Sequence, residues 1–236
     1  MSITFHAPKA KATTHSSTAL RIAFAINALV AATGLAIKFG EAATTADPRF
    51  PSVFGRVTNE LCYFTIESNL IVFAVCVALA WRPGPWRWVA GAPRLTALVC
   101  ITVTAVVYYA LLAGDEHFVG IAKVGDLLAH LVSPVLFVGT WLVGSRRDFQ
   151  RRHVPQMLVF PVLWLALTLI RGAIIHVYPY DFVDVAANGY VTVLVTIVAL
   201  LAAAGAMAAA AVRFDRRRRL AVLVDGAVGA LEPSLG

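Results

Sequence analysis

The sequence predicts an all-α polytopic membrane protein, a bundle of six transmembrane helices with both termini in the cytoplasm. Composition is the first observation behind this prediction: of 236 residues, 59% are hydrophobic and only 14% are charged, which is too apolar for a water-soluble domain. The second is a set of six apolar runs, each near the length of about 20 residues that a membrane-spanning helix needs. The third is that most basic residues fall on one side of the resulting topology. No room is left for a soluble catalytic domain, so any chemistry must lie within the helices or at their ends.

The six predicted helices account for most of the chain. They cover residues 19–38, 57–81, 93–113, 124–144, 156–176 and 188–212. Basic residues precede the first run, as in a signal peptide, but the run is too long for one and no clear small-residue cleavage site follows it. We therefore expect a retained helix. The predicted organisation is a flexible N-terminal arm (1–18), a six-helix transmembrane domain (19–212) and a basic cytoplasmic tail (213–236).

Charge fixes the predicted orientation. Fifteen of the 20 Lys and Arg residues lie in the arm or just after it at Arg21, in the loops 82–94 and 146–152, and in the tail, which places these segments in the cytoplasm. The sequence thus predicts a multi-pass protein of the cell membrane, with membrane lipids as its neighbours. Orientation and anionic headgroups explain the basic segment RFDRRRR better than nucleic-acid binding does. The three cysteines lie inside predicted helices at no metal-like spacing, so neither a metal nor a cofactor is expected, and nothing indicates an oligomeric partner.

Polar side chains gather in the outer half of the predicted bundle. At 1.5 Å per residue, Thr65 is expected about 12 Å below the outer end of the second helix, and His130 about 9 Å below that of the fourth. Other polar residues on the third and fifth helices reach the same level, namely Tyr108, Tyr109, Arg171 and His176. The inner half is almost entirely Val, Leu, Ala and Phe. This one-sided distribution predicts a site that faces outward.

Helical periodicity separates the polar residues of the second helix. Thr65, Ser68 and Asn69 share one face, whereas Glu67 lies on the opposite face and is not placed to activate Thr65 through its own helix. Glu67 and Arg171 are equally consistent with a buried structural ion pair and with a role in the site.

The fourth helix carries a second polar face, formed by Asp126, His130, Ser133 and Pro134. Asp126 precedes His130 by four residues, so its carboxylate can hold the tautomer and orientation of the imidazole ring. Pro134 lacks the amide hydrogen that would bond to the carbonyl of His130. We therefore expect that carbonyl to be free and the helix to be distorted there.

Each of these residues also has a purely structural interpretation. Ser, Thr and Asn in membrane helices most often form hydrogen bonds between helices, which taken alone favours packing roles for Thr65, Ser68 and Asn69. His130 taken alone is about as consistent with packing as with chemistry, and the position of His176 at a helix end is more typical of an interfacial residue.

Three short segments carry a family resemblance: YFTIESNLIVF (63–73), AHLVSPVLF (129–137) and VYPYDFVDV (177–185). They resemble the androgen-induced and androgen-dependent six-helix membrane protein family and its bacterial relatives, over roughly residues 20–212. Animal members are hydrolases of fatty acid esters of hydroxy fatty acids that use an intramembrane threonine nucleophile and a histidine. The resemblance implies these two roles for Thr65 and His130. It is closest to bacterial members, for which it implies no particular substrate.

The sequence therefore favours a carboxylic ester hydrolase that acts on lipid esters, with Thr65 as nucleophile and His130 as base. The expected supporting residues are Asp126, Asn69, Ser68 and Arg171. The candidate oxyanion donors are the Asn69 amide, Arg171 or a tyrosine hydroxyl. The expected substrate pocket holds Glu67, Tyr108, Tyr109, His176 and Tyr180.

Two other function classes remain open. In a non-enzymatic transporter or small-ligand binder, Glu67, Arg171 and Asp126 would line a polar pocket. In a b-type haem protein, His130 and His176 would be the axial ligands, although their predicted depths differ by about 9 Å.

Overall fold

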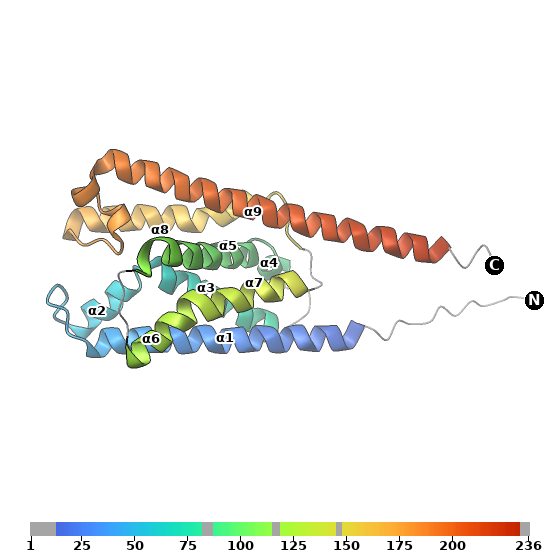
Figure 1. Cartoon of the computed structure of the whole chain (residues 1–236), viewed down its shortest axis with the longest axis horizontal. Helices are drawn as coiled ribbons and strands as arrows, with labels where there is room; N and C mark the ends of the chain where they lie inside the picture. The colour runs from blue at the N-terminus through green and yellow to red at the C-terminus, as the bar shows by residue number, and fades with distance from the viewer. Residues whose placement is uncertain (1–12, 82–86, 115–118, 145–147, 232–236) are drawn as a thin grey trace, which may run out of the picture.

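The computed structural model of the chain describes residues 13–81, 87–114, 119–144 and 148–231, and its described part is helical without any β-strand. Six segments are long and apolar enough to cross a membrane, which confirms the predicted all-α six-helix bundle of a multi-pass membrane protein. They are Thr18–Thr44, Phe64–Trp81, Ala92–Leu112, Gly120–Val143, His153–Ile175 and Val185–Leu220. The start of the first and the end of the last lie at the same end of the bundle (Figure 1).

Several of these segments are divided into shorter elements. The elements are α1 (Thr13–Thr44), α2 (Val53–Glu60), α3 (Phe64–Trp81), α4 (Arg87–Ala90), α5 (Ala92–Val107), η1 (Tyr108–Leu112), α6 (Gly120–Leu127), η2 (Leu128–Val132), α7 (Ser133–Val143), α8 (His153–Ile175), η3 (Asp181–Val183) and α9 (Val185–Leu231). Residues 1–12 of the predicted arm lie outside the described residues, and α1 already begins at Thr13. The helix α9 continues beyond the predicted boundary at 212, so the basic segment is a continuation of the sixth helix.

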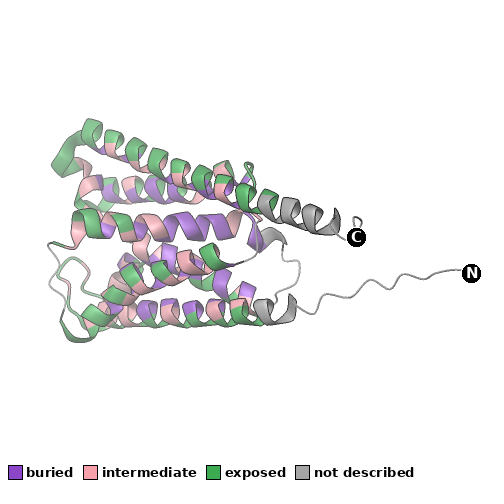
Figure 2. Cartoon of the chain, turned by 45° about the vertical axis from the view of Figure 1, so that its right-hand side comes forward, coloured by how far each residue is buried: buried purple, intermediate pink, exposed green. Residues whose placement is uncertain are grey.

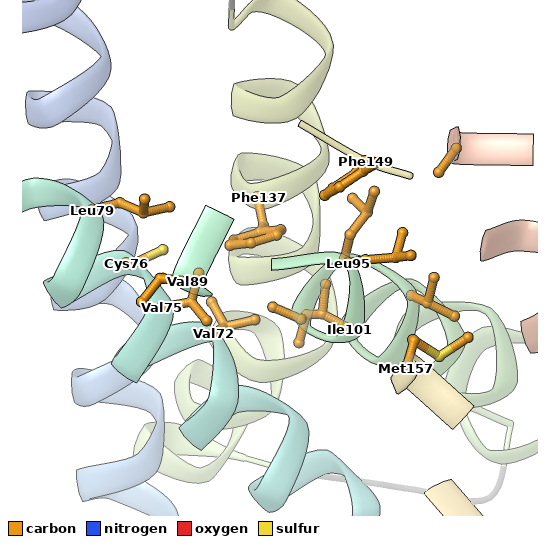
Figure 3. Close-up of a cluster of buried hydrophobic side chains, with 14 of the residues drawn as sticks. Val72, Val75, Cys76, Leu79, Val89, Leu95, Ile101, Phe137, Phe149 and Met157 are labelled. Carbon is orange, nitrogen blue, oxygen red and sulfur yellow. The ribbon is translucent and has the colours of Figure 1, made fainter. Parts of the chain in front are cut away.

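The main apolar core lies towards the end of the bundle that holds the termini. Buried side chains of α3, α5, α7 and α8 meet there, among them Val72, Leu95, Phe137 and Met157 (Figure 3). The outward faces of the helices remain exposed (Figure 2). They are nevertheless apolar, and Leu167 on α8 and Val195 on α9 are examples. An apolar exterior around a packed core is what a lipid environment requires.

The second predicted helix, 57–81, is in fact two helices separated by a turn at residues 61–63. Two hydrogen bonds from distant residues stabilise this break. The Trp164 indole donates to the carbonyl of Cys62 at 3.0 Å, and the Arg171 guanidinium donates to the Asn59 side chain at 2.7 Å. Thr65 is consequently the second residue of a new helix, α3, rather than a residue in the middle of a continuous one. The predicted depth of Thr65 was therefore based on the wrong helix start.

The fourth transmembrane segment contains a π-helical turn, η2, immediately before Pro134. In this wider turn the Ser133 amide donates to the carbonyl of Leu128, five residues back, instead of to that of Ala129. Pro134 has no amide hydrogen, so it cannot donate to the Ala129 carbonyl in place of Ser133. The carbonyl of Ala129 instead accepts a hydrogen bond from the Asn69 side chain at 3.2 Å. The predicted distortion is thus present, but the carbonyl shown to be bonded by another helix is that of Ala129, not that of His130.

Candidate functional site

Thr65 and His130 face each other across the bundle. The hydroxyl oxygen of Thr65, in the first turn of α3, lies 3.1 Å from Nε2 of His130, in the π-helical turn η2. His130 is buried, with 7% of its surface exposed, and Thr65 is partly buried. The two residues that the sequence nominates as nucleophile and base are therefore within hydrogen-bond distance.

Asp126 fixes the orientation of the imidazole. Its carboxylate lies 2.8 Å from Nδ1 of His130, and its own carbonyl oxygen lies 3.2 Å from the same nitrogen. Both groups are acceptors, so Nδ1 carries the hydrogen and Nε2 presents a lone pair. The Thr65 hydroxyl consequently donates to Nε2. The order hydroxyl, imidazole, carboxylate matches the arrangement that activates the nucleophile in hydrolytic triads.

Tyr108, the first residue of η1, supports this arrangement. Its hydroxyl donates to the second carboxylate oxygen of Asp126 at 2.8 Å, and its ring stacks on that of His130 with 3.8 Å between centroids. Tyr108 thus fixes the in-plane orientation of the imidazole through Asp126, and the stacking contact fixes the position of the ring face. Tyr109, the next residue, packs edge-on against Tyr108 but is 52% exposed and makes no contact with the Thr65–His130 pair.

Tyr180 approaches Thr65 from the loop between α8 and α9. Its hydroxyl oxygen accepts the Thr65 backbone amide at 3.3 Å and lies 3.4 Å from the Thr65 hydroxyl. Amides in the first turn of a helix lack main-chain acceptors, which leaves that of Thr65 available. Burial raises the pKa of Tyr180 to about 12, so the phenol remains protonated at neutral pH. Since the Thr65 hydroxyl donates to His130, the Tyr180 hydroxyl is the donor in its contact with Thr65.

Asn69 and Ser68 position the backbone around Thr65. The Asn69 amide nitrogen donates to the carbonyls of Thr65 at 2.9 Å and of Ala129 at 3.2 Å, which ties α3 to η2. The Ser68 hydroxyl lies 3.1 Å from the Thr65 carbonyl and 2.8 Å from the Thr104 hydroxyl on α5. Both Asn69 amide hydrogens thus have main-chain carbonyls as acceptors, as the packing interpretation of this residue expects.

Arg171 is a structural residue of the α2–α8 contact rather than a member of the site. Besides Asn59, its guanidinium reaches the carbonyl of Val177 at 3.4 Å and lies over the Phe50 ring. Glu67 is half-buried, and none of the salt bridges among the described residues joins it to Arg171. The ion-pair alternative is therefore wrong.

Two cavities meet at Thr65. An apolar pocket extends from it between α5, α8 and α9, and a polar vestibule extends from it beneath α2 and the loop that follows α1. Thr65, Tyr108 and Tyr180 line both cavities, while Asp126 and His130 line the vestibule. Three residues expected in the pocket line neither cavity: Glu67, Tyr109 and His176.

His176 lies at the end of α8, where it is exposed and adopts a left-handed backbone conformation. Both ring nitrogens of His130 already have hydrogen-bonding partners, so the histidine pair of the haem alternative is not assembled. Within the ranges that the structure covers, no three His, Cys, Asp or Glu side chains are grouped as a metal site would require.

The site holds further residues that nothing in the sequence marks. Trp164 packs edge-on against Phe64, the residue before Thr65, and Phe182 stacks on Tyr180. The contact between Trp164 and Phe64 joins segments that are far apart in the chain, so no local pattern reveals it. Comparison of the chain with protein-family models, with curated proteins and with solved structures finds no match.

Proposed function

We propose that the protein is an intramembrane ester hydrolase that uses Thr65 as its nucleophile and acts on lipid esters. The observation that carries this proposal is the hydrogen-bonded series from the Thr65 hydroxyl through His130 to Asp126. A threonine hydroxyl is a weak nucleophile until an adjacent base removes its proton. A neutral imidazole whose far nitrogen is held by a carboxylate is such a base.

In the proposed reaction, Nε2 of His130 takes the Thr65 proton while the threonine oxygen forms a bond to the ester carbonyl carbon. Asp126 stabilises the imidazolium that results. The tetrahedral intermediate collapses, the bond to the alcohol oxygen breaks, and His130 returns its proton to that oxygen. Water from the vestibule then loses a proton to His130, attacks the acyl-threonine and releases the carboxylic acid, which restores the Thr65 hydroxyl.

The oxyanion of the intermediate needs hydrogen-bond donors close to the nucleophile. The Tyr180 hydroxyl meets this condition, because it lies 3.4 Å from the Thr65 hydroxyl oxygen, and the Thr65 backbone amide donates to it and fixes its position. This donor does not depend on a charged side chain, and the high pKa of Tyr180 keeps its proton in place over the whole neutral and mildly alkaline range. We assign the Tyr180 hydroxyl to the oxyanion.

Tyr180→Phe is expected to lower kcat by about 10²–10³-fold, the usual cost of losing one oxyanion donor. The ring, and with it the packing against Phe182, is retained. Steady-state hydrolysis of p-nitrophenyl butyrate by detergent-purified protein measures the effect. Tyr109→Phe is the matched control, because it removes a tyrosine hydroxyl from an exposed position that lines neither cavity. Equal loss in both variants would show that the Tyr180 hydroxyl has no special role.

Rapid mixing with an excess of p-nitrophenyl butyrate tests the proposed function itself. An acyl-threonine intermediate predicts a burst of nitrophenol followed by a slower steady rate when deacylation limits turnover. Hydroxylamine in the buffer should then accelerate the steady phase and yield the hydroxamate. A small-ligand binder would release nitrophenol no faster than buffer, and that result would contradict the proposal.

A further inference from the structure

We infer that the apolar pocket is an acyl-chain site that selects by length, with the alcohol side of the ester in the polar vestibule. The inference rests on the proposed function and adds to it the orientation and size of the substrate. It follows from the composition of the two cavities, from the distance between Thr65 and the inner end of the pocket, and from the small side chain at that end.

The two cavities differ sharply in chemistry. Three helices supply the apolar pocket with aliphatic and aromatic side chains, and its polar groups lie near Thr65. One of them, the Thr104 hydroxyl, is already bonded to Ser68. The vestibule is lined instead by charged side chains, including Lys38, Glu41 and Asp47. Covering charged groups with hydrocarbon is unfavourable, so the alkyl chain of a bound ester belongs in the apolar pocket and the more polar part in the vestibule.

The depth of the pocket can be read along α5. Tyr108 contacts His130 and Asp126 and therefore marks the level of the reacting groups. Cys100, near the inner end, lies on α5 eight residues before Tyr108, the first residue of η1, and also lines the pocket. Eight residues at 1.5 Å each correspond to about 12 Å. Carbon–carbon bonds of about 1.5 Å at tetrahedral angles advance about 1.25 Å each, so an extended chain of about ten carbons spans the distance from the ester carbonyl to this end.

Packed side chains of the main core follow the inner end of the pocket. One turn inward from the pocket, Met157 on α8 and Ala208 on α9 are both fully buried in the main core. Ala204, one turn outward from Ala208, lines the pocket at its inner end. Its methyl group is the smallest side chain that could stand there apart from glycine. A larger residue at position 204 would occupy the space that the last carbons of the chain need.

The test compares Ala204→Leu with Ala203→Leu on a series of p-nitrophenyl esters from acetate to palmitate in one detergent. Ala203 is exposed on the outer face of α9, so it offers the same substitution without touching the pocket. We expect wild-type kcat/KM to rise up to the decanoyl ester and then fall. Each methylene excluded from an apolar site costs up to about fourfold, so the ratio of Ala204→Leu to wild type should drop about tenfold or more at decanoyl. For acetyl and butyryl esters that ratio should remain near one, which also shows that the variant is folded.

A ratio for Ala204→Leu that is independent of chain length, or that matches the ratio for Ala203→Leu, would overturn the inference while leaving the hydrolase proposal intact. Photolabelling tests the acyl-chain site independently of ester hydrolysis. Thr65→Ala protein, which keeps the pocket, is irradiated with decanoic acid that carries a terminal diazirine. We expect labelled peptides from residues 99–104 and 200–204, and their loss in the Thr65→Ala, Ala204→Leu double variant. If only lipid-facing residues are labelled, the inference is wrong. This outcome can be observed even if no ester is hydrolysed or Ala204→Leu does not fold.

Discussion

Thr65→Ala is expected to lower kcat for a short-chain ester by at least about 10³-fold, because the acyl-enzyme route is lost with the nucleophile. The substitution removes the side-chain oxygen that lies 3.1 Å from His130, but it leaves the backbone amide of Thr65 and the Tyr180 hydroxyl in place. Substrate binding should therefore change much less than kcat. Thr65→Ser, which restores a hydroxyl without the methyl group, should recover a substantial part of the rate.

Steady-state kinetics of purified protein, with its melting temperature as a check of folding, measure this effect. Thr58→Ala is the matched control, because Thr58 is an exposed threonine on α2. A Thr65→Ala variant that is folded and retains more than about a tenth of the wild-type rate would exclude Thr65 as the nucleophile, given the size of nucleophile effects in hydrolases.

His130→Gln is expected to lower kcat to a similar extent, about 10³-fold, since general-base and general-acid catalysis are lost together. Glutamine fills part of the imidazole site and still offers hydrogen bonds to Asp126 and Thr65, but it does not accept a proton at neutral pH. His176→Gln is the control, because His176 is exposed and lines neither cavity.

Groups that act as one catalytic unit give non-additive effects. The Thr65→Ala, His130→Gln double variant should therefore be no less active than the slower single variant. Multiplicative losses, measured in the same assay, would show that the two residues act independently and would contradict the proposed proton transfer.

The arrangement of the transmembrane segments could be predicted because hydrophobic length and charge distribution are local properties of a sequence. The break between α2 and α3 could not, because its cause lies elsewhere in the chain. The Cys62 carbonyl is satisfied by Trp164, and Asn59 is held by Arg171, more than 100 residues away in both cases. No proline or glycine marks residues 61–63, so an uninterrupted helix was the reasonable prediction.

The same distinction between local and distant contacts explains the site. Asp126 and His130 are four residues apart, and the contact between their side chains follows from helical spacing. Thr65 and His130 lie on different segments, and matched depth placed them at one level although the predicted start of the Thr65 helix was wrong. The expected ion pair between Glu67 and Arg171 shows that composition alone does not identify the partner of a buried charge. Nothing in the sequence shows that Asn59 is closer to the guanidinium than Glu67 is.

Labelling with an alkyl fluorophosphonate tests most directly whether His130 activates Thr65. The reagent transfers its phosphonyl group to an activated hydroxyl and releases fluoride, and tandem mass spectrometry locates the adduct. We expect about one phosphonyl group per wild-type chain, attached to Thr65, and none on that residue in His130→Gln protein. An adduct on another residue, or labelling of Thr65 that is equally fast without His130, would contradict the account.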